Sequence, residues 1–223
     1  MPNQRARAIQ TKVQIVLQSF FSKLLTLAAH LRLKFINDSG TQIGERSKLF
    51  KEIIPPDGIG AELGVYKGTL SQFILVENHP RKLYLIDPWW NYAGDWHWAV
   101  GDTSSVRSLA SILIVLRKAI SERRVEIRIE GSISALSSFN DGYLDWAYVD
   151  STHSYENTVA ELNLLKAKTK RGGIIAGDDW NPDPGHPHHG VYRAVKEFIE
   201  ANDEYLMVYQ EGKQWALRIT PAS

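Results

Sequence analysis

Residues 59–69 read IGAELGVYKGT and decide the fold class. The run from Ile59 to Gly64 is short and apolar, as expected of a buried β-strand. Glu62, Gly64 and Gly68 then follow the pattern E-x-G-x-x-x-G. Glycines in such a turn let the backbone bend sharply and approach a ligand closely. The stretch therefore predicts a strand, a ligand-binding turn and a helix from Thr69 to Glu77.

Strands and helices are predicted to alternate along the rest of the chain. Further apolar runs suit strands at residues 83–87, 125–130, 144–150 and 174–176, and helical spacing suits helices at residues 105–121, 154–170 and 191–201. Gly172-Gly173 is interpreted as the left-handed cap that ends the helix at residues 154–170. This order predicts an α/β protein with a doubly wound, mostly parallel sheet and helices on both faces.

The C-terminal segment departs from this alternation. Two strand-like runs, at residues 205–210 and 213–219, flank the turn candidate Glu211-Gly212. They predict an antiparallel hairpin that completes a seven-stranded sheet. A dinucleotide-binding domain would continue with another β-α unit, and its glycine motif is G-x-G-x-x-G. An NAD-linked oxidoreductase is therefore disfavoured.

The N-terminal segment is predicted to be an amphipathic helix. Between Val13 and Phe35 apolar residues recur at helical spacing, and six basic residues precede the first acid, Asp38. Charged residues interrupt the run, so it is a poor transmembrane span. Packing on the domain or within a homo-oligomer is favoured over membrane-surface contact. A polar linker at residues 37–44 separates residues 1–43 from a catalytic domain at residues 44–223.

Composition limits the partners and the metals. The 223-residue chain has a formal net charge of +1, so no overall charge attracts nucleic acid. It contains no cysteine, which excludes disulfides and thiolate metal sites. A metal would need oxygen or imidazole ligands, and this favours hard cations such as Mg²⁺. No signal peptide is recognisable, and a cytoplasmic location is expected.

Acidic residues stand at the C-terminal ends of three of the predicted strands. Asp87 ends the second strand, where a carboxylate can accept hydrogen bonds from ribose hydroxyls. Asp150 ends the fourth strand, and Asp178 and Asp179 end the fifth. Adjacent parallel strands would bring these last three carboxylates together, and a cation would then be needed to offset their repulsion. Oxygen ligands suit Mg²⁺ or another divalent cation.

Two histidine positions and one aromatic stretch could also contribute. His153 follows Asp150 by three residues and could act as a general base, or form a structural hydrogen bond at a helix start. His188 or His189 could contact a substrate or add a metal ligand, or lie in an exposed loop. The aromatic residues at 89–98 could form a lid over the site, or pack in the core.

These motifs together resemble class I S-adenosylmethionine (SAM)-dependent methyltransferases. Residues 61–68, 85–89, 148–156 and 172–179 are similar to the Rossmann-like O-methyltransferases of methyltransferase family 24, which are related to macrolide-sugar and catechol enzymes. The resemblance spans residues 59–219. It implies that the cofactor is bound by Glu62, Gly64, Val65, Tyr66, Gly68, Thr69, Asp87, Trp89, Gly131, Ser132 and Asp150.

The resemblance also implies a reaction. Asp150, Asp178 and Asp179 would hold Mg²⁺, which binds a hydroxyl of a small molecule, such as a sugar or a natural product. His153, or Asp150 itself, would take the proton as the methyl group is transferred. One alternative is a metal-dependent hydroxylase of the cephalosporin-hydroxylase type, but no convincing set of two histidines and one carboxylate is apparent. Another is a SAM-binding module without enzymatic activity.

Overall fold

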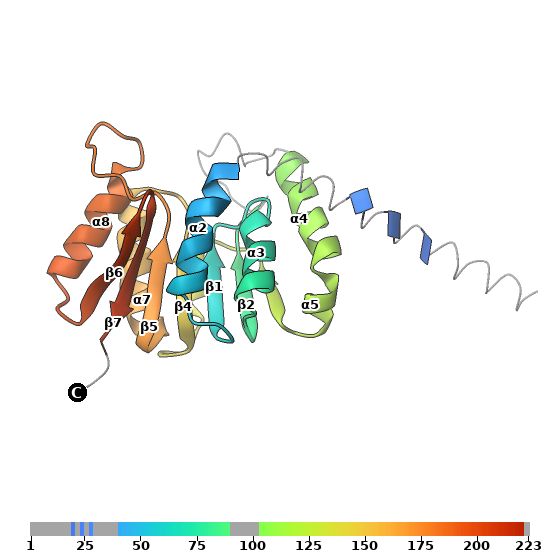
Figure 1. Ribbon diagram of the computed structural model, residues 1–223, viewed down its shortest axis with the longest axis horizontal. Helices are drawn as coiled ribbons and strands as arrows, with labels where there is room; N and C mark the ends of the chain where they lie inside the picture. The colour runs from blue at the N-terminus through green and yellow to red at the C-terminus, as the bar shows by residue number, and fades with distance from the viewer. Residues whose placement is uncertain (1–18, 21–22, 25–26, 29–39, 90–102, 221–223) are drawn as a thin grey trace, which may run out of the picture.

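A computed structural model describes residues 19–20, 23–24, 27–28, 40–89 and 103–220 (Figure 1). Its strands are β1 (Ile59–Leu63), β2 (Lys82–Ile86), β3 (Val125–Arg128), β4 (Leu144–Val149), β5 (Thr169–Gly177), β6 (Tyr205–Glu211) and β7 (Gln214–Ile219). Its helices are α2 (Gly40–Glu52), α3 (Thr69–Glu77), α4 (Thr103–Val115), α5 (Arg117–Ser121), α6 (Ser132–Ser137), α7 (Tyr155–Lys168) and α8 (His189–Glu200).

The strands form one seven-stranded sheet in the order β3-β2-β1-β4-β5-β7-β6. Strands β1 to β5 pair in parallel, whereas β7 runs antiparallel to both β5 and β6. The prediction of a mostly parallel sheet with an antiparallel C-terminal hairpin is therefore confirmed. The strand order reverses beside β1, because β1 pairs with β2 on one side and with β4 on the other. Ligands of open parallel sheets bind at such a switch point.

Helices cover both faces of the sheet (Figure 1). Residues of α2, α3, α4 and α5 pack in one core, and residues of α6, α7 and α8 pack in the other. Strand β4 contributes side chains to both cores. Trp146 and Tyr148 lie in the first core, and Ala147 and Val149 lie in the second. A strand covered on both faces needs apolar residues at successive positions, and this explains the continuous apolar run that predicted it.

Helix α2 was not predicted from the sequence. It begins at Gly40, inside the stretch interpreted as a linker, so residues 40–44 are helical. The helix is anchored by Leu49 and Phe50, which are fully buried. The Phe50 ring centroid lies 5.7 Å from that of Trp146 and 5.3 Å from that of Tyr148. Tertiary packing against β4 therefore stabilises a helix whose N-terminal half has weak helical propensity.

Other elements also differ from the prediction. The helix expected at residues 105–121 is divided into α4 and α5, and the short helix α6 was not predicted. The helix expected to end near Lys170 ends at Lys168, because Thr169 is already extended and pairs with Leu144. Gly173 lies within β5, where a Cβ would stand 2.8 Å from the backbone oxygen of Asp145. The Gly172-Gly173 pair thus belongs to a strand, and its interpretation as a helix cap was wrong.

Part of the predicted N-terminal helix lies within the described residues. Residues 19–20, 23–24 and 27–28 are helical, and Phe20, Leu24 and Leu27 each expose more than half of their surface. The remainder of that prediction lies outside the described residues. Within the described parts of the chain, no helix has the length and apolar character needed to cross a membrane.

Candidate active site

The carboxyl ends of four parallel strands meet at one edge of the sheet. The register pairs Leu63 with both Ile86 and Val149, and pairs Val149 with Gly177. The next residue on each strand continues this alignment, because Gly64 N donates to Ile86 O at 2.9 Å and Asp150 N donates to Leu63 O at 2.8 Å. Gly64, Asp87, Asp150 and Asp178 therefore lie along one edge, as the sequence predicted.

Asp87 organises the turn that follows β1. Its Oδ2 accepts hydrogen bonds from Val65 N at 2.9 Å and from Tyr66 N at 2.8 Å, while its Oδ1 accepts one from Trp89 N at 2.6 Å. Burial raises the pKa of Asp87 above its ordinary value, against the effect of these three N–H groups. The carboxylate is thus a structural acceptor for the turn, with Oδ1 the less occupied oxygen. Hydrogen bonding of Asp87 to a ribose stays a prediction.

Glu62 is buried beneath the same turn. Its side chain accepts a hydrogen bond from Ser71 Oγ at 2.6 Å. Burial raises the pKa of Glu62 to about 8, although Ser71 opposes the shift. Glu62 is therefore protonated in part at neutral pH. A carboxyl group with such a shifted pKa at the end of a central strand is typical of functional sites.

The other predicted cofactor residues lie around this turn and at the start of α6. Val65 and Trp89 are buried, and Trp89 Nε1 donates to Tyr66 O at 3.0 Å. Gly68 and Thr69 begin α3, and Gly131 and Ser132 begin α6. Contact of these residues with the cofactor stays a prediction. Of the aromatic stretch considered as a lid, only Trp89 lies within the described residues, and it packs in the core.

Arg46 was missed by the sequence reasoning. It lies on α2, and its Nη2 donates to Asp150 Oδ2 at 2.8 Å and also to Asp178 Oδ2. Its side chain is 14 % exposed, so this ion pair is largely withdrawn from water. Burial alone would lower the pKa of Arg46, but the neighbouring acidic groups raise it instead, and the guanidinium stays charged. Burial also raises the pKa of Asp150 to about 6, even beside Arg46.

The C-terminal hairpin holds Asp178 from its other side. Gln214 Nε2 donates to Asp178 Oδ1 at 2.6 Å, and Trp215 Nε1 donates to the Asp178 backbone oxygen at 2.9 Å. The Gln214 amide is itself oriented by the hydroxyl of Tyr148, which donates to Gln214 Oε1 at 2.7 Å. Asp178 is therefore fixed between α2 and β7.

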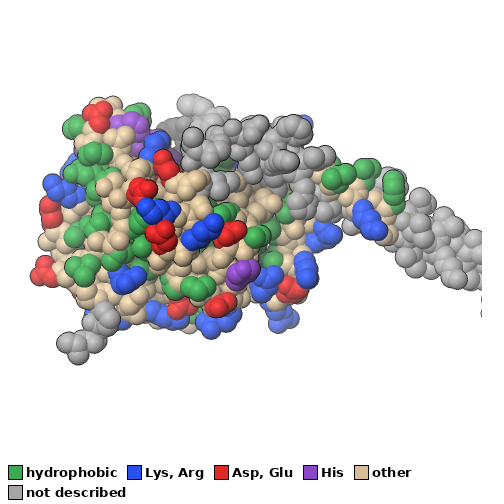
Figure 2. Space-filling model, in the orientation of Figure 1, with side chains coloured by type: hydrophobic (Ala, Val, Ile, Leu, Met, Phe, Trp, Pro, Cys, Tyr) green, Lys and Arg blue, Asp and Glu red, His purple; other side chains and the backbone are tan. Residues whose placement is uncertain are grey.

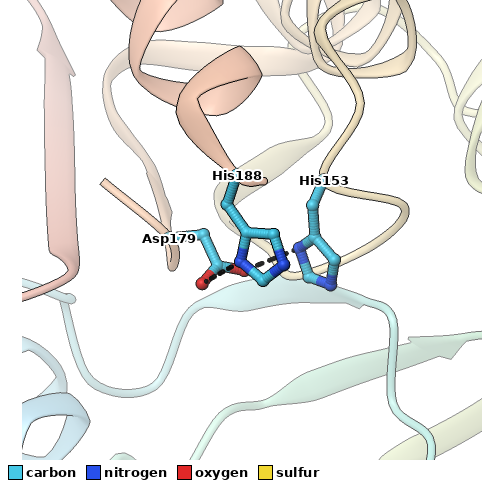
Figure 3. Close-up of side chains that lie close together, drawn as sticks. All are labelled: His153, Asp179 and His188. Carbon is cyan, nitrogen blue, oxygen red and sulfur yellow. Dashed lines mark ion pairs between the residues drawn. The ribbon is translucent and has the colours of Figure 1, made fainter. Parts of the chain in front are cut away.

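Asp179 faces two histidines instead of the other two carboxylates. Figure 3 shows the rings of His188 and His153 side by side, each joined by a dashed line to the carboxyl group of Asp179. His153 Nδ1 lies 2.7 Å from Asp179 Oδ2, and His188 Nδ1 lies 2.8 Å from Asp179 Oδ1. The two rings stack with centroids 4.6 Å apart. Among the described residues, this is the group of three acidic or imidazole side chains whose ligand atoms all lie within 4.8 Å.

The predicted carboxylate cluster is therefore divided. Asp150 and Asp178 share Arg46, while Asp179 pairs with His153 and His188. The expectation that the chain lacks a set of two histidines and one carboxylate was wrong, because His188, at the start of α8, joins His153 and Asp179. Magnesium binding by the three carboxylates stays a prediction.

Electrostatics couple the members of the second group. Burial alone would raise the pKa of Asp179, but the two imidazoles hold it well below its usual range. Burial alone would lower the pKa of His153, but its hydrogen bond to Asp179 and the nearby carboxylates raise it. The Asp179 carboxylate therefore sets the ring orientation and the protonation of His153.

Several site residues have left-handed backbone conformations. His153 has φ 58° and Asp179 has φ 64°, while Tyr66 and Trp89 have φ 47° and 42°. Such conformations cost on the order of 1–3 kcal/mol each in non-glycine residues and concentrate at functional sites. Their occurrence in the loops after β1, β2, β4 and β5 supports this edge as the site.

Comparison with known families identifies the chain. The family model described as a methyltransferase domain, family 24, matches residues 61–180, which is more than half of the chain. The chain belongs to this family of class I SAM-dependent methyltransferases. The match covers Asp87, Asp150, His153 and Asp179 of this methyltransferase, whereas Arg46 and His188 lie outside it. Among curated proteins, none matches the sequence.

Solved structures share the fold of the methyltransferase at low sequence identity. A protein from Corynebacterium glutamicum has a TM-score of 0.61 at 13% identity, covering 88% of this chain and 91% of its own. An O-methyltransferase from Bacillus cereus, solved in complex with SAH, has a TM-score of 0.59 at 13% identity, with coverages of 86% and 90%. A putative rRNA-methylase from Clostridium thermocellum has a TM-score of 0.54 at 12% identity, with coverages of 79% and 96%.

Proposed function

We propose that this methyltransferase transfers the methyl group of SAM to a hydroxyl group of a small molecule, such as a sugar or a natural product. The observation that carries the proposal is the 2.7 Å contact between His153 Nδ1 and Asp179 Oδ2. A hydroxyl is a weak nucleophile until its proton is removed, so its methylation benefits from a positioned base. A histidine oriented by a buried carboxylate supplies such a base.

The chemistry follows from the tautomer that Asp179 selects. The carboxylate keeps a proton on Nδ1 of His153, so the basic lone pair belongs to Nε2. When Nε2 takes the proton of the acceptor hydroxyl, the charge of the resulting imidazolium is stabilised by Asp179. The positive charge of the SAM sulfonium disappears in the same step. The residues of the β1 turn therefore contribute mainly by aligning the methyl group with the acceptor and excluding water.

The proposed reaction does not use a magnesium ion at the three carboxylates. Magnesium at Asp150, Asp178 and Asp179 would need to displace Arg46 from the first two carboxylates and His153 or His188 from the third. As arranged here, the three carboxylates do not fit a single magnesium site, and no step above depends on one. Asp150 is a weaker candidate for the base than His153, because Arg46 occupies its Oδ2.

Charge supports a small acceptor over a nucleic acid. The formal net charge is +1, and on the face shown in Figure 2 basic and acidic side chains are intermixed. Proteins that bind nucleic acid usually gather basic residues in a patch or stripe. The likeness to the putative rRNA-methylase, at 12% identity, shows a shared fold and carries no argument about the acceptor.

The test begins with calorimetric titration of SAM, with Mg²⁺ and again with EDTA. Phenols and sugars are then screened as acceptors, and SAH formation is measured. His153→Ala is expected to bind SAM as wild type does but to lower kcat by about 10²–10⁴-fold, as removal of a general base does. The exposed His79→Asn, at the opposite edge of the sheet, is the control. Absence of SAM binding by wild type in every condition would refute the proposal.

A further inference from the structure

His153, Asp179 and His188 come together from three separate segments. His153 precedes α7, Asp179 follows β5, and His188 is the N-cap of α8 (Figure 3). Two imidazoles and one carboxylate form a set of ligands that binds transition metals while leaving coordination positions open. We infer that these three side chains bind a divalent transition-metal ion, such as Zn²⁺ or Fe²⁺, and that the site discriminates against Mg²⁺.

The state of His188 supports this inference. Its Nδ1 is buried and makes no hydrogen bond, although it lies 2.8 Å from Asp179 Oδ1. A buried polar atom without a hydrogen bond is costly, so such atoms call for an explanation. A bound metal ion would explain the unpaired nitrogen. Two ligand atoms that each lie about 2.1 Å from an ion, at about 90° to each other, are roughly 3 Å apart. The separations of 2.7 and 2.8 Å from Asp179 to the two imidazoles are close to that spacing.

The local charge also favours a divalent cation. Asp150, Asp178 and Asp179 carry three formal negative charges, and Arg46 neutralises one of them. With neutral histidines, two negative charges remain at this edge of the sheet. Clustered carboxylates repel one another unless a cation is present, and one divalent ion would complete the balance. Arg46 occupies the position between Asp150 and Asp178, which leaves Asp179 as the available anionic ligand.

The ligand type decides which ion is bound. Magnesium prefers six oxygen ligands, whereas imidazole suits Zn²⁺, Fe²⁺, Co²⁺ and Ni²⁺. The two rings lie within 19° of parallel, so one must rotate before both Nδ1 atoms point at a common ion. His188 is the ring with more room, since its side chain is 34% exposed and that of His153 is 24% exposed.

Metal binding and the base role of His153 exclude each other, because a neutral imidazole that binds a metal through Nδ1 carries its proton on Nε2, the nitrogen proposed as the base. A metal on Nδ1 replaces the proton that Asp179 otherwise holds there. In the loaded protein the ion could instead lower the pKa of a hydroxyl that binds one of its open positions. The inference concerns occupancy of the site and does not depend on the proposed acceptor, so it is tested by binding.

The test uses the full chain, stripped with EDTA and titrated with Co²⁺, whose visible absorption reports nitrogen and oxygen ligands. One equivalent of Co²⁺ is expected to bind, to be displaced by Zn²⁺, and to be unaffected by millimolar Mg²⁺. His188→Ala should weaken Co²⁺ binding by at least about 100-fold, since it removes a ligand directly. His189→Ala is the matched control, because His189 Nδ1 contacts Asn181 O instead of Asp179.

A second variant separates this site from the three-carboxylate site. Asp178→Asn should retain Co²⁺ binding here, because the Asp178 side chain contacts Arg46, Gln214 and the Asp179 N–H, and an asparagine Oδ1 can still accept from that N–H. Cooperative thermal unfolding of each variant shows that it is folded. Absence of stoichiometric Co²⁺ binding by wild type, or binding unchanged in His188→Ala, would overturn the inference. Loss of Co²⁺ binding in Asp178→Asn would also overturn it, in favour of the carboxylate cluster.

Discussion

Gly64 and Asp150 approach so closely that a Cβ on residue 64 would stand 1.9 Å from the backbone oxygen of Asp150. Gly64 also has φ 85°, a conformation that side chains disfavour. The contact joins the turn predicted to bind SAM to the loop that carries His153. The glycine of the motif therefore sets the distance between the cofactor turn and the proposed base.

Gly64→Ala is expected to reduce both stability and SAM binding. The new methyl group would collide with backbone, which cannot move aside as a flexible side chain could. The loss should amount to about 1–3 kcal/mol in the free energy of unfolding, measured by urea denaturation. Gly44→Ala is the control, since it lies in α2 with no atom within 4 Å of its Cβ position, and it should gain about 0.5–1 kcal/mol. Equal stability of the two variants would contradict the steric argument.

Removal of Arg46 should destabilise the protein. Arg46→Ala leaves Asp150 and Asp178 side by side without their shared cation, and breaking a buried ion pair costs about 3–5 kcal/mol. Lys48→Ala, which removes an exposed pair with Glu211 from the same helix, should change stability little. The free energy of unfolding in urea measures both.

The Arg46 variant also tests the magnesium prediction. If Arg46 replaces a metal, millimolar Mg²⁺ should raise the unfolding temperature of Arg46→Ala by several degrees and leave that of wild type unchanged. A similar increase in wild type would show that Mg²⁺ binds without removal of the guanidinium.

The parallel sheet could be predicted because its strands are buried on both faces. In β1, β2 and β4 this produces short apolar runs that end at a glycine or an aspartate, a pattern visible without tertiary information. Helix α2 could not be found this way, since its sequence contains two glycines and its stability comes from Leu49 and Phe50 against β4. The end of α7 was misplaced because Gly172-Gly173 suits a helix cap as well as a strand in close contact with its neighbour.

The sequence predicted the site residues whose positions depend on where strands end. It did not predict the contacts that depend on the direction of a side chain. Asp87, Asp150 and Asp178 lie at one edge because of the register alone. Asp179 has a left-handed backbone conformation and its carboxylate contacts His153 and His188, a direction that no sequence pattern specifies. Arg46 was missed because it reaches the site from α2, outside the motifs, whereas His188 was considered as a metal ligand or substrate contact without its pairing with Asp179.

Burial of Glu62 gives stability a defined dependence on pH. The pKa of Glu62 is raised to about 8 in the folded protein, and an unfolded glutamate has a pKa near about 4.3. The folded state therefore holds more protons between these values, and Glu62 lowers stability progressively as pH rises through this window. Glu62→Gln should remove this dependence. The difference in unfolding free energy between the variant and wild type should therefore shift in favour of the variant from pH 5 to pH 8. Urea unfolding at both values measures the effect, with the exposed Glu77→Gln as the control.

The same carboxyl should couple SAM binding to proton release. If Glu62 borders the cofactor as predicted, the positive sulfonium favours the carboxylate and lowers the pKa of Glu62. Binding near pH 7 would then release part of a proton. Calorimetric titrations of SAM in two buffers of different ionisation enthalpy should give different binding enthalpies, and Glu62→Gln should remove the difference. Buffer-independent enthalpies in wild type would place the sulfonium away from Glu62.

The rate of methyl transfer should report the pKa of His153 directly. The base must be unprotonated, so kcat/KM should increase with pH through a midpoint above the ordinary histidine value, because Asp179 raises the pKa of His153. Asp179→Asn removes the negative charge that favours the imidazolium, so its midpoint should fall while its maximal rate decreases. The profile is measured from about pH 5.5 to 9 with EDTA present, which keeps His153 free of metal. Asp183→Asn, in the exposed loop before α8, should retain the wild-type midpoint. An Asp179→Asn profile with an unchanged midpoint would show that a group other than His153 accepts the proton.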